Sequence, residues 1–183
     1  MTGSSRNLDV LVSGLIRDVP DFPEAGVVFK DISPLLADHD GFSAVVEALA
    51  ATGRDARGAP VVDKVAGIEA RGFILAAPVA LALGAGFVAV RKEGKLPGLT
   101  HSESYSLEYG SATLQIHQDA LTAGERVLLI DDVLATGGTA AATISLIERC
   151  GAHVEAVVVL IELGFLHGRD KLGSHRLVAL TTV

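Results

Sequence analysis

The sequence predicts an α/β fold with a central, mostly parallel sheet and helices on both faces. Two observations carry this prediction: short strands that are apolar throughout, and helical segments that alternate with them along the chain. A strand without polar residues has to be covered on both faces, as in a parallel sheet between helices. One stretch departs from this pattern, because residues 112–117 alternate apolar and polar side chains and predict part of a hairpin.

The spacing of apolar residues places the elements in chain order. Residues 8–16 carry apolar side chains on one helix face, and Pro20 and Pro23 end that helix. Residues 21–36, interrupted by prolines and a glycine, are expected to be irregular but apolar enough to cover something. The elements expected next are a helix from Phe42 to Gly53 or Gly58, strand 61–67, helix 72–83, strand 87–91, polar loop 92–104, a hairpin of 107–109 and 112–117, strand 127–130, helix 137–150, and strands 154–161 and 177–180.

Size and charge limit the class of protein. The chain has 183 residues, which predicts one domain, and its formal charge of −7 argues against a general nucleic-acid binder. No apolar run reaches the roughly 18 residues of a membrane span, and the start of the sequence does not resemble a signal peptide. A single cysteine, Cys150, excludes an internal disulfide and a zinc cluster. We therefore expect a cytoplasmic protein that does not bind membranes.

Residues 127–139 carry the strongest functional signal. Ligands of open α/β sheets bind beyond the carboxyl ends of the strands, which directs attention to residues 67–71, 91–95 and 131–139. In the last of these, a buried strand leads into two adjacent carboxylates, a turn and a helix. The residues of this stretch are Asp131 and Asp132, followed by Thr136, Gly137, Gly138 and Thr139.

The chemistry of this stretch predicts a sugar-phosphate site. Free amides at the start of a helix bind phosphate, and adjacent glycines let the backbone approach it closely. Two carboxylates would repel a bare phosphate, but they suit the hydroxyls of a ribose or a Mg²⁺ ion. The plainer alternative is that the acids cap the helix and the glycines only turn the chain.

Other ligand motifs are absent from the sequence. No G-x-G-x-x-G follows a strand, and the Gly94-Lys95 pair lacks the first glycine and the Ser or Thr of a P-loop. The six histidines show no metal-binding spacing. The sequence therefore gives no support to an ATPase, a dinucleotide enzyme or a histidine-bound metal site.

The 127–139 stretch resembles the motif with which phosphoribosyltransferases bind 5-phosphoribosyl-1-pyrophosphate (PRPP). Three other regions resemble the adenine-specific members of that family: 21–36 their base-covering hood, 67–73 their pyrophosphate loop, and 91–98 with 105–110 their flexible loop and the strand after it. The match runs from about residue 8 to residue 164. The first motif is common to the family, whereas the segments in this order are specific to the adenine enzymes. The sequence departs from the usual pattern at Ala25, Lys30, Glu69 and Val133.

The resemblance implies an activity and an organisation. The activity is purine salvage: transfer of the phosphoribosyl group from PRPP to adenine, giving AMP and pyrophosphate through an oxocarbenium-like transition state. Mg²⁺ is implied as the cofactor, adenine and PRPP as the small-molecule substrates, and a homodimer as the assembly. Residues 1–183 would form one phosphoribosyltransferase domain, with an N-terminal helix and hood over 1–36 and a flexible loop and hairpin over 92–117. Residues 92–108 would act as a lid that excludes water.

The resemblance also assigns roles to residues. The catalytic set is Glu108, Arg71, Asp131 and Asp132. The PRPP-binding set is Asp131, Asp132, Ala135, Thr136, Gly137, Gly138, Thr139, Arg71, Arg91, Lys92, Lys95 and Tyr105. The adenine-binding set is Val28, Phe29, Lys30, Val133 and Glu108. No protein residue is expected to ligate the metal directly, since Mg²⁺ would be held by PRPP and reach Asp131 and Asp132 through water.

Several alternatives stay open at this stage. The base could be hypoxanthine, xanthine or orotate, or the domain could sense PRPP as a regulatory module without catalysis. Arg71 could be a surface residue paired with Glu69, and the basic cluster of residues 91–95 a solvated charge run. Phe29 could be ordinary core, and Glu108 a strand-edge residue without a role.

Overall fold

The computed structural model describes residues 2–106 and 110–183, and within them the chain divides into two compact units, Met1–Ala48 and Leu49–Val183. The first unit holds α1 (Thr2–Leu15), β1 (Arg17–Pro20), β2 (Val28–Asp31) and α2 (Ser33–Ala37). Helix α3 (His39–Ala51) leads from the first unit into the second. The division of the chain into these units leaves the single-domain expectation a prediction.

The hood segment is more regular than the sequence indicates. Strands β1 and β2 pair antiparallel from Arg17↔Asp31 to Pro20↔Val28, and two ion pairs cross this ladder. Arg17 Nη2 lies 2.6 Å from Asp31 Oδ2, and Lys30 Nζ lies 2.7 Å from Asp18 Oδ1. Helix α2 follows at once because Pro34 stands in its first turn, where a missing N–H costs no hydrogen bond. The expectation of an irregular 21–36 is therefore wrong for residues 28–31 and 33–36.

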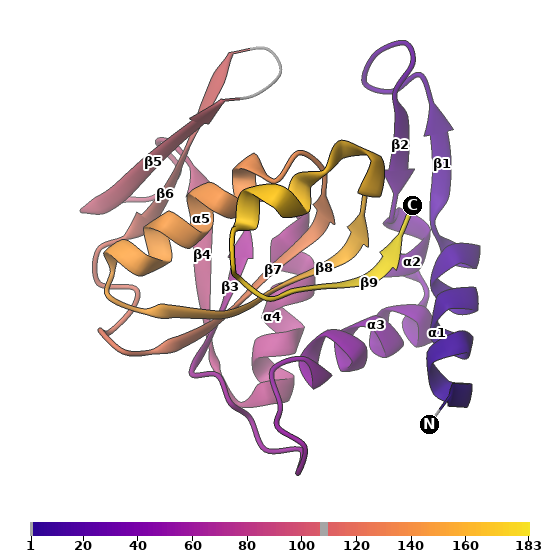
Figure 1. Cartoon of the computed structure of the whole chain (residues 1–183), viewed down its shortest axis with the longest axis horizontal. Coiled ribbons are helices and arrows are strands. Elements are labelled where there is room, and N and C mark those ends of the chain that lie inside the picture. Colours follow the sequence, from indigo (N-terminus) through magenta and orange to yellow (C-terminus); the bar gives the residue numbers. More distant parts are fainter. Residues whose placement is uncertain (1, 107–109) are drawn as a thin grey trace. The chain divides into compact units, whose positions relative to one another are not determined.

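Among the residues that the structure describes, seven strands of the second unit form one sheet in the order β5-β6-β4-β3-β7-β8-β9 (Figure 1). Their bounds are β3 Lys64–Ile68, β4 Gly86–Lys92, β5 Thr100–Ser106, β6 Ser111–His117, β7 Arg126–Leu134, β8 His153–Glu162 and β9 Leu177–Thr182. Strands β4, β3, β7, β8 and β9 are parallel, while β5 and β6 form the antiparallel edge.

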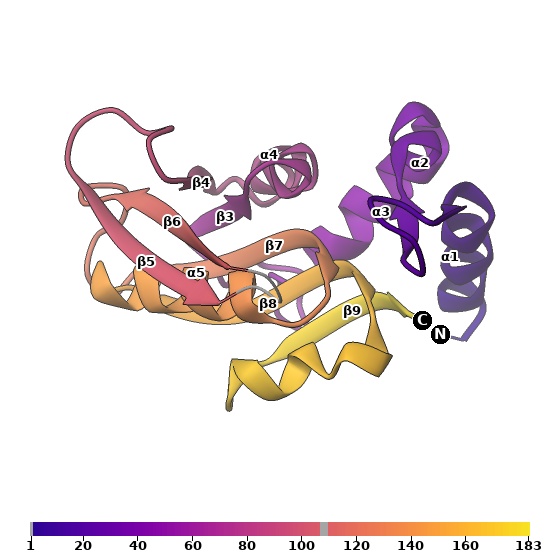
Figure 2. The same cartoon turned by 90° about the horizontal axis from the view of Figure 1, so that it is seen from above.

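Helices cover both faces of this sheet, as the sequence predicts. Helix α4 (Arg71–Leu83) lies on one face and α5 (Gly138–Arg149) on the other (Figure 2). Alternate residues of β7 serve the two sides: Val127 and Leu129 belong to the core that contains the buried residues of α5. The side chains of β7 are buried along most of its length, which explains why its apolar run is so clear in the sequence. The predicted fold class is confirmed.

Two strands differ from the sequence-based prediction. The expected strand 107–109 lies outside the described residues, and β6 pairs instead with β5, inside the stretch expected to be a loop. Strand β5 has the sequence THSESYS, so no apolar alternation marks it, and its ladder with β6 is what defines it. Strand β7 also continues through Asp131 and Asp132 to Leu134, beyond its predicted end at residue 130.

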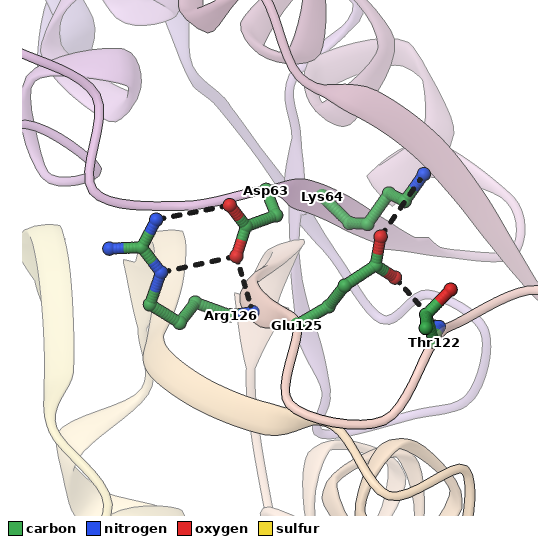
Figure 3. A network of polar contacts seen from close by, with 5 residues as sticks. All are labelled: Asp63, Lys64, Thr122, Glu125 and Arg126. Atoms are coloured by element: carbon green, nitrogen blue, oxygen red, sulfur yellow. Dashed lines mark hydrogen bonds and ion pairs between the residues drawn. The ribbon is translucent and has the colours of Figure 1, made fainter.

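A polar network ties together the amino ends of β3 and β7 (Figure 3). Arg126 donates from Nε and Nη2 to Asp63 at 3.1 and 3.0 Å, and its backbone N–H donates to the same carboxylate at 2.8 Å. Beside this pair, Lys64 Nζ lies 3.6 Å from Glu125 Oε1, and Glu125 Oε2 accepts the N–H of Thr122 at 2.8 Å. The hydrogen bonds from Arg126 lower the pKa of Asp63 to about 2.

In the part of the chain that the structure describes, the longest apolar helices fall short of what is needed to cross a membrane.

The Asp63–Arg126 pair gives a pH-dependent contribution to stability. Because the pKa of Asp63 is lower in the folded state, the pair stabilises the fold above about pH 4 and is lost as the pH falls through about 2. We expect Asp63→Asn to lower the melting temperature at pH 7, but only by a few degrees, because an exposed ion pair contributes little. The difference in melting temperature between variant and wild type should become smaller between pH 4 and 2. Thermal melts test this prediction, with Asp119→Asn as a control that removes another exposed carboxylate. A difference in melting temperature that stays constant with pH would contradict the prediction.

Candidate active site

The carboxyl ends of β3, β4 and β7 lie side by side in the sheet and carry most of the predicted site. Strand β3 ends at Ile68, just before the Glu69–Arg71 turn, and β4 ends at Lys92. Strand β7, which neighbours β3 on its other side, ends at Leu134, just before the glycine-rich turn. The topology therefore gathers three of the segments that the sequence singles out, although they are far apart along the chain.

Residues 135–139, predicted to bind phosphate and called the phosphate loop below, include the first two residues of α5, Gly138 and Thr139. Gly137 has a φ of 78° and precedes the first residue of the helix, which explains the need for glycine there. Four loop residues, Ala135, Thr136, Gly137 and Thr139, line a cavity of about 80 Å³. Asp131, Val133 and Ala140 also line it.

Gly138 and Tyr105 line a neighbouring, larger pocket of about 360 Å³. Tyr105 is tied to the phosphate loop because Thr139 Oγ1 donates a hydrogen bond to its hydroxyl at 3.1 Å. Strand β5 is therefore linked to the loop by side chains, and Lys171 from a later segment completes the wall of this pocket.

The two carboxylates at the end of β7 occupy different environments. Asp132 is buried, with 5% of its surface exposed, whereas Asp131 is half-buried and accepts the N–H of Asp132 at 2.9 Å. Burial, and then the neighbouring charge of Asp132, raise the pKa of Asp131 well above its usual value. The charge of Arg71 acts in the opposite direction without cancelling this rise. The Asp131 carboxyl therefore binds a proton more readily in the folded protein than in an unfolded chain.

Gly72 makes room for Asp131, a requirement that sequence reasoning missed. A Cβ at position 72 would stand 2.8 Å from Asp131 Oδ1 and 3.0 Å from the carbonyl oxygen of Ile130. The start of α4 therefore packs directly on the end of β7, and only glycine fits between them. The signal was present in the sequence, as a glycine inside the first turn of a predicted helix beside Arg71.

The basic residues are held by acids of the same site. Arg71 Nε lies 2.8 Å from Asp132 Oδ2, in an ion pair whose geometry is not that of a hydrogen bond. Arg91 meets Glu69 through Nε at 3.2 Å and Nη2 at 3.3 Å. The partner of Glu69 is thus Arg91 and not Arg71, contrary to the surface pairing considered from the sequence.

Glu69 organises the turn between β3 and α4. Its carboxylate also accepts the backbone N–H of Lys92 at 3.0 Å, and Arg91 Nη1 donates to the carbonyl of Lys95 at 2.9 Å. Although partial burial works the other way, the hydrogen bonds from Arg91 and Lys92 lower the pKa of Glu69. Lys92 and Lys95 themselves are exposed. From the sequence, Glu69 stood out only as a departure from the family pattern and as a possible partner of Arg71, and its contacts with Arg91 and Lys92 were not foreseen.

The predicted base-binding residues fall into different parts of the chain. Val28, Phe29 and Lys30 belong to β2 of the first unit, where the rings of Phe22 and Phe29 meet edge to face at 5.1 Å. Val133 lies in the second unit, next to the two carboxylates. Glu108 lies outside the described residues. The adenine-binding set and the lid over residues 92–108 therefore stay predictions.

Comparison with known proteins identifies the family. A sequence profile described as phosphoribosyl transferase domain matches residues 35–172. The chain belongs to this family. The resemblance found in the sequence is thereby confirmed, and the phosphate loop of the structure lies within the matched region.

The similar proteins share one name. An adenine phosphoribosyltransferase of Nocardioides sp. is 69% identical over 92% of this chain and 91% of its own length. One of Streptomyces coelicolor is 60% identical over 88% of this chain and 87% of its own. Among solved structures, the adenine phosphoribosyltransferase of Thermoanaerobacter pseudethanolicus has a TM-score of 0.89 at 46% identity, covering 96% of this chain and 99% of that one.

A second solved structure carries ligands. The adenine phosphoribosyltransferase of Saccharomyces cerevisiae, complexed with an imino-altritol bisphosphate and adenine, has a TM-score of 0.89 at 36% identity. The match covers 98% of this chain and 99% of the yeast chain.

The raised pKa of Asp131 predicts that its charge costs stability at neutral pH. An unfolded aspartate ionises near pH 3.9, so the folded state loses stability as the pH rises from there towards the raised pKa. Asp131→Asn keeps the shape without the charge. We expect it to melt at about the same temperature as wild type near pH 4 and a few degrees higher at pH 7.

Thermal melts over this pH range provide the measurement, again with Asp119→Asn as the control for removal of a surface carboxylate. A variant that melts below wild type at pH 7 would show that the Asp131 charge is not a cost to the fold.

Proposed function

We propose that this chain transfers the 5-phosphoribosyl group of PRPP to adenine, giving AMP and pyrophosphate in purine salvage. The observation that carries the proposal is the phosphate loop at the end of β7 with two carboxylates beside it, in a chain 69% identical to a protein named adenine phosphoribosyltransferase. Departure of pyrophosphate builds positive charge at the ribose C1. The site must therefore hold the ribose phosphate, stabilise that charge and receive the leaving group.

The phosphate loop binds the 5′-phosphate of PRPP. The backbone amides of residues 135–139 stand at the positive end of the α5 dipole, and α5 is long enough for that dipole to matter. The hydroxyls of Thr136 and Thr139 add donors. Thr139 already donates to Tyr105, so the β5–β6 hairpin is linked to this end of the substrate.

Asp131 and Asp132 bind the ribose hydroxyls, and their charge favours the cation that develops at C1. Arg71 holds Asp132 before substrate arrives. When the pyrophosphate of PRPP attracts Arg71, the same movement releases Asp132 for the ribose. A single exchange of ion pairs thus prepares both halves of the substrate site.

The pyrophosphate is bound by Arg71 together with Arg91, Lys92 and Lys95. Arg91 has to give up its contacts with Glu69 in part, whereas the exposed lysines can turn to a ligand without breaking an ion pair with Glu69. Substrate phosphates replace carboxylates around the arginines, so the positive charge of the arginines is balanced before and after binding.

The base is bound by Val28, Phe29, Lys30 and Val133, with apolar side chains against the flat purine and backbone groups at its edge. Glu108 approaches the purine ring and handles the N7 proton while N9 attacks C1 and the bond from C1 to pyrophosphate breaks. A carboxylate within hydrogen-bond reach of the ring can accept this proton as a general base.

Mg²⁺ fits the chemistry of the residues present. The buried Oδ2 of Asp132 is ion-paired with Arg71 but accepts no hydrogen bond in the described chain, and Asp131 adds a second carboxylate next to it. Among the described residues, no group of three His, Cys, Asp or Glu side chains gathers to hold a metal. The two aspartates would therefore hold the ion through water, with PRPP supplying the other oxygens. The ion would supply a Lewis acid that withdraws charge from the pyrophosphate.

A homodimer and a cytoplasmic location complete the proposal. Apolar side chains project from one side of α4, where Ile74 is 44% exposed and Leu81 is 84% exposed. Positions 74, 78 and 81 fall on one helix face, and all three are apolar, which suits an interface with a second copy. Cys150 is a free thiol, as is typical of a reducing compartment.

The function is tested by pyrophosphate release from PRPP and Mg²⁺ with adenine, hypoxanthine, guanine, xanthine or orotate. We expect turnover with adenine alone. Turnover with a 6-oxopurine or orotate would keep the transfer chemistry and overturn the assignment of the base. Binding of PRPP without turnover on any base would favour a regulatory module.

The homodimer is tested by light scattering on the purified chain. We expect twice the 18.9 kDa mass of one chain for wild type, and a monomer for Leu81→Glu because a buried charge opposes association. The matched control is Val10→Glu on α1, where Val10 is 71% exposed. A dimer that dissociates with Val10→Glu but not Leu81→Glu would place the interface on α1, and a monomeric wild type would exclude the dimer.

A further inference from the structure

The segment between β8 and β9 packs against the phosphate loop, although the proposed function gives it no role. It consists of two short 3₁₀ helices, Gly164–Leu166 and Gly168–Leu172 (yellow in Figure 1). A Cβ at Gly168 would collide with the carbonyl oxygen of Ala135 and stand 2.9 Å from the backbone nitrogen of Gly137. A Cβ at Gly137 would likewise collide with the carbonyl of Gly168. The two backbones therefore touch directly, with glycine on both sides.

An ion pair fixes this segment next to the contact. Arg169 donates from Nε to Glu162 Oε1 at 3.0 Å and from Nη2 to Oε2 at 2.6 Å, so both carboxylate oxygens are engaged. The side chain of Glu162 is only 8% exposed at the end of β8, whereas that of Arg169 is 55% exposed. Such a bidentate pair fixes the orientation of the two side chains as well as their distance. Because Arg169 follows Gly168 in the chain, it also sets the position of Gly168.

The ends of the segment are anchored in the second unit. At its start, Leu163 donates its N–H to the carbonyl of Leu134, the residue before the phosphate loop, at 2.9 Å. At its end, Leu172 is buried in the core that contains Leu134 and the inner face of α5. The segment is thus tied to the strand before the loop and to the helix after it.

We infer that the Glu162–Arg169 ion pair is a positioning device for PRPP binding, which holds Gly168 against the phosphate loop and so keeps the loop amides convergent. This inference rests on the proposed function, because it needs residues 135–139 to bind the 5′-phosphate. Arg169 is a positioning residue and acts through Gly168. A loop that turns on glycines has little stiffness of its own, and phosphate binding needs several amides aimed at one point.

The device acts on one end of the substrate only. The 5′-phosphate depends on the loop amides, whereas the pyrophosphate depends on the arginine and lysine side chains at the ends of β3 and β4. Loss of the ion pair should therefore weaken ligands that carry a 5′-phosphate and spare pyrophosphate and adenine. General loss of stability would weaken all of them together.

Arg169→Met is the main variant, and Arg126→Met is its matched control. Both substitutions remove an arginine that grips a carboxylate with two nitrogens, but Arg126 stands at the amino end of β7, away from the loop. Calorimetry would measure the binding of ribose 5-phosphate and of pyrophosphate with Mg²⁺, and kinetics would give kcat and both KM values. Melting temperatures accompany each variant.

We expect Arg169→Met to weaken ribose 5-phosphate binding and raise the KM for PRPP by about 10-fold or more, the scale of a misplaced binding group. Pyrophosphate affinity and the KM for adenine should stay within about 2-fold, and Arg126→Met should leave all four values near wild type. Arg169→Lys keeps the charge but not the paired nitrogens of a guanidinium. Its affinity for ribose 5-phosphate should lie between those of wild type and Arg169→Met. Equal affinities of Arg169→Met and Arg126→Met for ribose 5-phosphate would overturn the inference.

Gly168→Ala keeps the test decisive if Arg169→Met fails to fold. It leaves the ion pair in place and presses a methyl group against Ala135 and the amide of Gly137. It should weaken ribose 5-phosphate and spare pyrophosphate, and an unchanged affinity for ribose 5-phosphate would overturn the inference. Failure of the proposed function looks different, since wild type itself would then fail to turn over adenine, whether or not it binds ribose 5-phosphate.

Discussion

Burial of β7 between β3 and β8 is the constraint on which the rest of the structure depends. After Arg126 the strand is apolar and hydrogen-bonded on both sides until it reaches Asp131, so polar residues stand only at its two ends, and its carboxyl end carries both aspartates. There β7 ends, and the backbone must turn before α5 begins. Gly72 at the start of α4 and Gly168 beyond β8 each approach this end closely because they lack a side chain. The site is thus shaped by main-chain packing around one strand end.

Charge within the site is balanced by its own residues. Each of the two arginines has a carboxylate partner, Arg71 with Asp132 and Arg91 with Glu69. Under the proposed function, a polyanionic substrate would compete with these partners, and the displaced carboxylates would become available to hydroxyls or a cation. The raised pKa of Asp131 comes first from its burial and then from the charge of the adjacent Asp132. In the absence of a ligand, these ion pairs neutralise the charges of the site.

The sheet could be predicted from sequence because burial on both faces leaves an apolar run, as in residues 127–130 and 156–161. Strand β5 left no such run, since it lies at the sheet edge and its residues are largely polar. Helix α2 was hidden because a proline was read as a breaker, although it stands where helices accept one.

The phosphate loop was recognisable for a different reason, since its residues are contiguous and carry a motif. The ion-pair partners were not, because sequence proximity suggested Glu69 for Arg71, whereas the fold brings Asp132 from β7. Gly168 gave no signal at all, since a glycine that touches a distant backbone has no side chain to mark it. Contacts of this kind are visible only in three dimensions.

The approach of Gly137 and Gly168 has a consequence for protein engineering. Because main-chain atoms make this contact, it does not depend on the side chains of the neighbouring residues. The segment between β8 and β9 is therefore a unit that can be exchanged between relatives, provided that its glycine and its arginine keep their places. Chimeric chains built at this junction would keep the loop geometry if Gly168, Arg169 and the Glu162 partner are all retained.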